Sequence, residues 1–284
     1  MIDVQPPSHL LLLVVAAVLA GTVNSLAGGG TLITFPSLLA VGLPARVANA
    51  TNTMALWPGL ISSLWGYRRF VRNNGKAILL LGLPSLVGGT AGALLLSHTT
   101  DNTFARILPW LILMATGLFA SQGIVANFIR NRRTESHQPL EEEADNPPWT
   151  PYWYVAVPFQ FIIGLYGGYF GAGIGILILT NLGLLGFHHM HKMNGLKNIF
   201  GALVNVMALV VFITARLPAG TGVGPGRNLM IDWPVAGLMA CGSIAGGYMG
   251  SRFARRVGQV VVRRLVVVIG VSLSLTLLLH PVTH

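Results

Sequence analysis

Long apolar stretches separated by short polar stretches dominate the chain. An α-helix needs about 20 mostly apolar residues to cross the roughly 30 Å core of a bilayer, and several of the stretches are that long. One stretch is too short for a span, and another is too long for a single straight one. The apolar stretches cover 10–27, 31–41, 47–64, 77–96, 107–128, 153–185, 196–213, 233–250 and 265–279.

Composition supports a membrane protein. Hydrophobic residues make up 53% of the 284 residues and charged residues only 9%, whereas a soluble domain carries about 25% charged residues. The mean hydropathy is +0.67. The first apolar stretch has no basic segment before it, so we interpret it as a membrane segment rather than a cleaved signal. Cys241 is the only cysteine, which excludes an internal disulfide.

A hydrophilic segment divides the chain into two parts of similar size. Residues 129–151 are rich in proline and hold five of the eight acidic residues, so we expect a solvated linker with little tendency to fold. We therefore expect a first transmembrane repeat at 1–128 and a second at 152–284.

The two parts resemble each other in sequence. AGGGTLITFPSLLAVGL (27–43) matches GAGIGILILTNLGLLGF (171–187), and LVGGTAGALL (86–95) matches IAGGYMGSRF (244–253). Between these pairs, residues 49–65 match 194–210 more weakly. Three similarities in the same order indicate a duplication.

Loop charges predict that the two repeats have opposite orientations. The loop GYRRFVRNNGK carries four positive charges, and its counterpart at 214–232 carries two Arg and one Asp. The later loop at 97–106 has one Arg and one Asp, whereas its counterpart RFARRVGQVVVRR has five Arg. Lys and Arg stay cytoplasmic, so equivalent loops lie on opposite sides. This predicts a cytoplasmic linker and periplasmic termini, and the net charge of +10 reports topology rather than nucleic-acid binding.

Glycine-rich segments interrupt the first element of each repeat. By the loop charges, residues 152–187 begin and end on the same side, and residues 1–43 do so from the other side. Each segment must re-enter or cross twice in short helices. Backbone that is not helical at membrane depth must be buried in protein or line a cavity. We interpret these glycines as opening the backbone to a solute, and those of GGTAG and GGYMG as close helix packing.

The fold class predicted is all-α: a polytopic membrane protein with two inverted repeats of four to five segments, containing Gly-broken or re-entrant helices. In total we expect eight to ten membrane segments. Inverted repeats joined by a hydrophilic linker are the architecture of many secondary transporters.

Polar residues in the apolar segments suggest the substrate. Asn194, Lys197, Asn198 and Asn205 share one helix face, and buried polar residues are usually functional, although hydrogen bonds between helices are the alternative role. All eight acidic residues lie outside these segments or at an edge. Amides, one lysine and freed helix N-termini suit a small anion. The candidate substrate-binding residues are Asn24, Gly28, Gly29, Gly30, Asn49, Thr51, Asn52, Gly171, Gly173, Gly175, Asn194, Lys197 and Asn198.

Two other sets of residues have side chains that could carry chemistry. His188, His189 and His191 could ligate a metal or sense protons, but a polar turn on the cytoplasmic side is the expected role. No nucleophile has a membrane-embedded base beside it, so we expect no enzyme activity, no catalytic residue and no cofactor.

The chain resembles the TauE/SafE family of sulfite-exporter-like permeases. The similarity lies in the stretch from Ala27 to Arg69, in GGTAGALL, in GLYGGYFGAGIGILIL, in KMNGLKNIFGALVNVMALVVF and in GGYMGSRFARR. It implies a bacterial inner-membrane permease for small sulfur-containing anions such as sulfite, sulfoacetate or other organosulfonates.

We therefore expect alternating access to a site between the repeats, in contact with the lipid bilayer. Candidate coupling ions are H⁺ and Na⁺, and a homodimer is a candidate assembly. The alternatives are a passive channel for a small solute and a membrane metal-binding protein that uses the histidine cluster.

Overall fold

The computed structural model describes residues 6–26, 28–71, 74–135, 152–187, 189–218, 220–224, 228–253 and 259–279. Within these residues the regular secondary structure is helical, apart from two isolated β-bridges that Leu229 makes with Arg216 and Val223. The helices are α1 (Pro7–Leu26), α2 (Thr31–Ala40), α3 (Ala45–Val71), α4 (Gly75–His98), α5 (Asp101–Glu135), α6 (Trp153–Tyr169), α7 (Ile174–Leu184), α8 (Met190–Thr214), α9 (Trp233–Phe253) and α10 (Gln259–Leu279). The all-α class is confirmed.

Several of these helices suit a bilayer. By length and composition, the stretches Pro7–Ser25, Gly75–His98, Asp101–Ser121 and Met190–Thr214 could each cross one, among the described residues. Helices α2 and α7 have 10 and 11 residues, and at 1.5 Å per residue each reaches about halfway across the core. Large apolar side chains such as Leu11, Leu79 and Val155 are exposed on the outside of the bundle, as lipid contact requires.

The helix before the expected linker is longer than its apolar stretch predicts. Helix α5 continues to Glu135, so residues 129–135, which were expected to have little tendency to fold, are helical. Its final turns read NFIRNRRTE, in which the Arg and Glu residues are good helix formers. These turns extend a helix that is already formed in the membrane segment, so no new nucleation is needed. Residues 136–151 lie outside the described residues.

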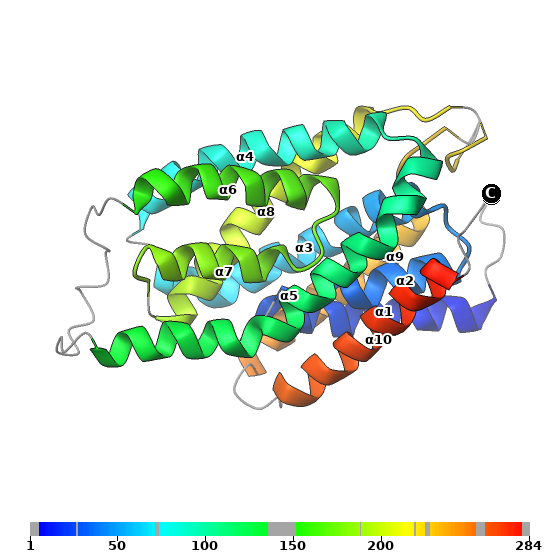
Figure 1. Ribbon diagram of the computed structural model, residues 1–284. Helices are drawn as coiled ribbons and strands as arrows, with labels where there is room; N and C mark the ends of the chain where they lie inside the picture. Colours follow the sequence, from blue (N-terminus) through cyan, green and yellow to red (C-terminus); the bar gives the residue numbers. More distant parts are fainter. Residues whose placement is uncertain are drawn as a thin grey trace.

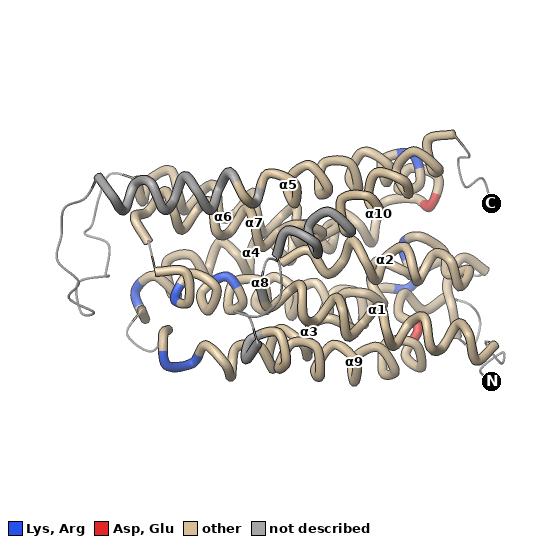
Figure 2. Tube along the Cα trace, turned by 90° about the horizontal axis from the view of Figure 1, so that it is seen from below, with Lys and Arg blue, Asp and Glu red and all other residues tan. Residues whose placement is uncertain are grey.

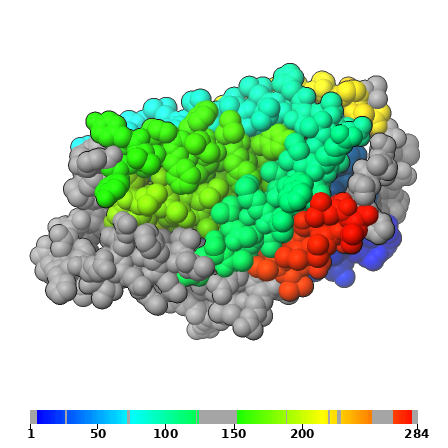
Figure 3. Space-filling model, in the orientation of Figure 1, coloured from blue at the N-terminus to red at the C-terminus, as the bar shows by residue number. Residues whose placement is uncertain are grey.

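Helices from the two parts of the chain are interleaved (Figure 1). Helix α1 packs against α9, and α6 packs against α4. Helices α3 and α8 contact each other and also pack against α9 and α4, respectively. Helices α5 and α10 lie side by side across the face drawn in Figure 3. Each part therefore buries its first helix against the fourth helix of the other part.

The GGTAG and GGYMG motifs lie where these helices approach most closely. A methyl group on Gly92 would lie 2.0 Å from the carbonyl oxygen of Leu165 on α6, and one on Gly246 would lie 2.0 Å from that of Val18 on α1. Small residues let transmembrane helices pack backbone against backbone. The packing role predicted for these glycines is confirmed.

Gly246→Ala is expected to destabilise the protein, because its new methyl group meets backbone that cannot move aside cheaply. Overpacking costs about 1–3 kcal/mol, which should lower the midpoint of thermal unfolding in detergent. Gly237→Ala is the matched control on α9, because a methyl group there meets nothing within 4 Å. Equal midpoints for the two variants would contradict close packing at α1 and α9.

Two helical hairpins enter the bundle from opposite ends (Figure 1). Helix α6 starts at the left-hand end, the chain turns inside the bundle, and α7 runs back beside it. Helices α1 and α2 form the corresponding pair from the right-hand end. In both hairpins the chain therefore enters and leaves at the same end of the bundle, as expected for the two glycine-rich segments.

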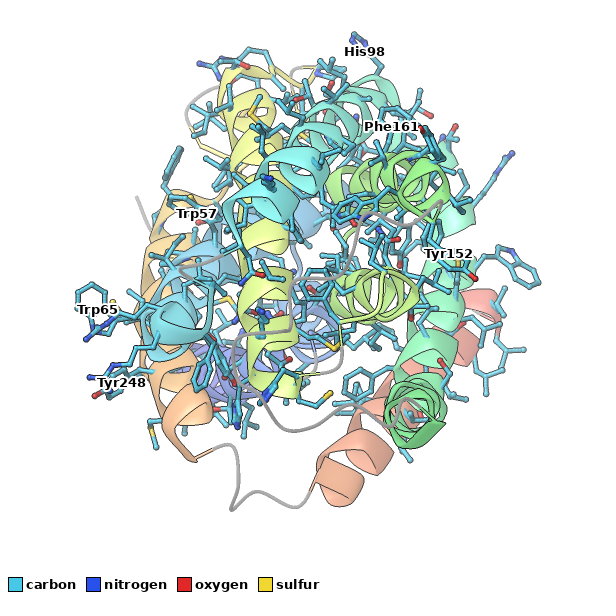
Figure 4. All side chains as sticks on the ribbon, turned by 90° about the vertical axis from the view of Figure 1, so that its left-hand side faces the viewer. Trp57, Trp65, His98, Tyr152, Phe161 and Tyr248 are labelled. Carbon is cyan, nitrogen blue, oxygen red and sulfur yellow. The ribbon has the colours of Figure 1, made fainter. Side chains whose placement is uncertain are left out.

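The two ends of the bundle differ in charge (Figure 2). Lys and Arg of the described residues lie at both ends, but the end where α3 finishes and α8 begins carries none of the acidic residues drawn, whereas at the other end Lys and Arg lie near acidic residues. Near the basic end, the guanidinium of Arg68 lies 4.2 Å from the centre of the Trp65 ring. Trp65 and Tyr248 lie at the outer edge of the bundle in Figure 4 and are exposed, which is typical of aromatic residues at a membrane interface.

Candidate functional site between the two helix breaks

A short segment without helical structure joins the two helices of each hairpin: residues 28–30 before α2 and residues 170–173 before α7. These segments are the two helix breaks, and each contains a glycine in the left-handed region. Gly28 has φ +82° and Gly171 has φ +77°, values that other residues adopt at a cost. The N–H of Gly28 donates to the carbonyl of Val23 over 3.2 Å, and the N–H of Gly171 donates to that of Tyr166 over 3.2 Å. The two breaks therefore use the same turn.

Asn24 connects the two helices of the first hairpin. Its Oδ1 accepts the N–H of Gly30 over 2.8 Å, so a side chain of α1 is hydrogen-bonded to the residue just before α2. In the second hairpin, Gly173 precedes α7 with φ +76°. Both α2 and α7 therefore begin inside the bundle, where the first N–H groups of a helix lack intrahelical acceptors.

The two breaks meet each other. A methyl group on Gly28 would lie 2.7 Å from the Cα of Gly175, so the backbones of the two parts touch. Gly29 and Gly30 are needed for packing, since a methyl group there would lie 2.2 Å from the ring of Phe119 or 2.4 Å from the carbonyl of Ala20. The N-termini of α2 and α7 thus lie on either side of one contact.

A cavity of about 40 Å³ lies beside this contact. On this measure a single water needs about 10–15 Å³, so the cavity has room for a few waters or a compact ion. Its lining comes from α1, α2, α3, α7, α8 and the breaks: Asn24, Gly28, Thr31, Asn52, Thr53, Leu56, Leu60, Phe170, Gly171, Ile174, Gly175, Ile178, Lys197, Asn198, Gly201 and Asn205. Seven of the thirteen candidate residues are among them: Asn24, Gly28, Asn52, Gly171, Gly175, Lys197 and Asn198.

Lys197 is the one charged side chain among the described residues that line this cavity. It is 2% exposed, so it does not reach the membrane surface. Its Nζ donates to the carbonyl oxygens of Asn24 over 3.0 Å and Ser25 over 3.5 Å. These carbonyls belong to the last turn of α1, where the helix dipole favours a positive charge.

Amides and hydroxyls form the remaining polar surface. Asn52 accepts a short hydrogen bond from the Thr34 hydroxyl, and its Nδ2 donates to Thr31 Oγ1 over 3.3 Å. Asn198 Nδ2 donates to Ser63 Oγ over 2.8 Å, and its Oδ1 is buried without a partner. These hydrogen bonds fix the orientations of the Asn52 and Asn198 side chains in the lining.

The other six candidate residues lie outside the lining. Asn49 Nδ2 donates to the carbonyl of Tyr169 over 3.1 Å, and Thr51 Oγ1 accepts the N–H of Asp232 over 3.0 Å. Asn194 is buried, and its Oδ1 has no partner. Gly29, Gly30 and Gly173 shape the breaks. Because the N–H groups of Gly28, Gly30 and Gly171 already donate to the protein, Gly175 in the first turn of α7 is the better backbone donor.

Some lining residues were not among the candidates. Thr31 and Thr53 line the cavity beside Asn52, and Asn205 lies one turn beyond Gly201. The sequence signal for Asn205 was its shared face with Lys197, and Thr31 directly follows the three glycines. Phe170 and Ile174 carry no polar signal, and only the fold shows that they flank the second break.

The histidine turn lies apart from the cavity. The His191 ring stacks on Phe70 with centroids 5.2 Å apart, and His189 is exposed before α8. His188 lies outside the described residues. In the described part of the chain, no group of three His, Cys, Asp or Glu side chains could hold a metal ion.

Comparison with known proteins shows to which family the chain belongs. Residues 13–277 match the family described as sulfite exporter TauE/SafE. The chain belongs to this family. It is a multi-pass membrane protein of a family of transporters rather than enzymes.

Curated relatives cover almost the full length. A probable membrane transporter protein, ORF9 of Sinorhizobium sp, is 30% identical over 97% of this chain and 95% of its own. YfcA of Escherichia coli, also named a probable membrane transporter protein, is 28% identical over 96% of this chain and 90% of its own. YunE of Bacillus subtilis is 22% identical over 91% and 94%. No solved structure matches.

Proposed function

We propose that this chain is a secondary transporter for a small sulfur oxyanion or organosulfonate, which binds in the cavity between the two breaks. The observation that carries the proposal is Lys197, a buried amine that faces the cavity with no carboxylate in the lining. An uncompensated buried charge costs several kcal/mol, so a bound anion would supply the missing counter-charge. The family description of a sulfite exporter points to the same class of anion.

The rest of the lining suits an oxyanion as well. Thr31 and Gly175 lie in the first turns of α2 and α7, where helix N-termini attract anions. If the Asn198 amide rotates by half a turn, its Oδ1 and Nδ2 exchange places. The Ser63 hydroxyl then donates to Oδ1, and the NH₂ group faces the cavity. Leu56, Leu60 and Ile178 give the lining an apolar side that would suit a short apolar tail. The volume favours an anion of few atoms.

Inverted repeats would supply alternating access. The sequence similarities, the hairpins that enter from opposite ends (Figure 1), and the exchange of packing partners between α1–α9 and α6–α4 all support two related halves. A site at the interface of such halves opens to each side in turn when one half rocks against the other. Gly28 and Gly175 form the contact between the halves that lies beside the cavity.

The difference in charge between the two ends of the bundle supports an orientation. The end where α3 finishes and α8 begins, which carries Lys and Arg and none of the acidic residues drawn in Figure 2, is the cytoplasmic one by the positive-inside rule. The N-terminal end of α1 lies at the opposite end, so the termini are periplasmic in a bacterial inner membrane.

Counterflow in liposomes tests this proposal. Vesicles that contain the purified full-length protein and unlabelled methanesulfonate are diluted into labelled methanesulfonate. A carrier that exchanges substrate is expected to accumulate label transiently, to saturate with concentration, and to be inhibited by sulfite. Vesicles with no protein are the control. Uptake that neither overshoots nor saturates would indicate the alternative, a passive channel, and would overturn the proposal.

A further inference from the structure

We propose that Lys197 carries a coupling proton, so that the chain moves one proton together with each monovalent anion in the same direction. This inference rests on the proposed function and assigns the co-transported ion at the same site. Nothing in the sequence supplied a carboxylate for such a role, and the structure offers an amine in its place.

The hydrogen bonds of Lys197 fit a group with two protonation states. A neutral amine has two N–H groups, and two carbonyl oxygens, those of Asn24 and Ser25, face Nζ at 3.0 and 3.5 Å. An ammonium has three N–H groups. The third needs an acceptor in the cavity, and the anion is that acceptor. The empty site therefore matches the neutral amine, and the loaded site matches the ammonium.

Among the described residues, no carboxylate lies on α8 or on the helices that pack against it to compensate Lys197 when the anion leaves. The ionisable side chains on α8 and on the helices that pack against it are His9 of α1; Arg46, Tyr67, Arg68 and Arg69 of α3; Lys76 and His98 of α4; Tyr154, Tyr166 and Tyr169 of α6; and His191 and Lys192 of α8 itself, while α7 has none. None is a carboxylate. The Tyr166 hydroxyl already donates its proton to the carbonyl of Ala172 over 2.6 Å.

The proton and the charge both balance over one transport cycle. On the side where the substrate enters, Nζ takes a proton from water and the anion binds beside it. On the other side the anion leaves, water enters the cavity, and one N–H bond of the ammonium breaks. Its electron pair stays on Nζ, the proton passes to the water, and the neutral amine returns. The loaded and the empty carriers then carry the same charge through the membrane.

This scheme predicts which gradient drives accumulation. A proton and a monovalent anion together carry no net charge, so a pH difference drives uptake and a membrane potential does not. Methanesulfonate stays anionic across the useful pH range, so any proton that moves with it belongs to the protein. In liposomes of the full-length chain, with the potential clamped to zero, one pH unit is expected to give about tenfold accumulation at equilibrium. A potential without a pH difference is expected to give none.

Lys197→Arg tests the residue, because a guanidinium stays charged. This variant is expected to exchange anions more slowly than the wild type, and to reach equilibrium under a pH difference without accumulation. Lys192→Arg, on the same helix but outside the cavity lining, is the matched control and should accumulate like the wild type. If Lys197→Arg does not exchange, Lys197→His is the second variant. Its charge changes nearer neutral pH, so half-maximal net uptake should move to lower pH.

The outcomes separate this inference from the proposed function. If the wild type shows no counterflow at all, the proposed function fails. If it shows counterflow but no accumulation under a pH difference, proton coupling is overturned and the anion site stands. Accumulation by Lys197→Arg equal to that of the wild type, or an unmoved pH profile in Lys197→His, would overturn the assignment to Lys197.

Discussion

Replacing Lys197 by glutamine is expected to lower methanesulfonate counterflow by at least about 30-fold. Removing one partner of a desolvated charge pair costs about 2–5 kcal/mol, and each 1.4 kcal/mol is about tenfold in affinity. Glutamine keeps much of the side-chain length and one hydrogen-bond donor group toward the carbonyls of Asn24 and Ser25. The loss therefore reports the charge rather than the packing, and it is measured as the initial rate of label uptake.

Lys192→Gln is the control for that experiment. Lys192 lies on the same helix, is half-buried, and is not part of the cavity lining. Its replacement removes one positive charge from α8 as well, so the net charge of the helix changes by the same amount. Thermal unfolding of both variants checks that each is folded. Equal, small effects on counterflow would contradict Lys197 as the counter-charge.

Gly28→Ala is expected to abolish transport, although it adds only one methyl group. The new Cβ would lie 2.7 Å from the Cα of Gly175, so the breaks must separate and the cavity lining must move. A displacement of about 1 Å at a site can cost about 100-fold in rate. The φ of +82° adds about 1–2 kcal/mol of backbone strain.

Gly42→Ala separates these two effects. Gly42 has φ +87° at the end of α2, and a methyl group there meets nothing within 4 Å. The variant therefore carries the same backbone strain without the clash. We expect it to unfold at a lower temperature and to transport nearly as well as the wild type. Loss of transport in both variants would show that strain, rather than contact between the breaks, explains the effect.

Much of the fold follows from the sequence because the bilayer restricts the choices. Length and hydropathy predict the long helices, and GGG and GAG predict breaks since backbone at membrane depth needs protein or a cavity around it. The extent of α5 was not predicted, because polar residues such as Asn131 and Arg132 continue a helix as readily as they end one.

The candidate site could be predicted only in part. The polar residues of α8 fall on one face, which places Lys197 and Asn198 in the lining together with Asn205. Asn49 and Thr51 carry the same kind of signal, but they pair with Tyr169 and Asp232. These partners lie more than 100 residues away, so the spacing in sequence cannot distinguish a structural amide from one that faces a ligand.

The most direct test of the account is to locate the bound anion. Selenite is the selenium analogue of sulfite and scatters X-rays anomalously. Crystals of the full-length protein soaked with selenite are expected to show one dominant anomalous peak within hydrogen-bond distance of Lys197 Nζ, between the N-termini of α2 and α7. The peak should disappear in Lys197→Gln and persist in Lys192→Gln. A dominant peak elsewhere, or one at the cavity that survives Lys197→Gln unchanged, would contradict the account.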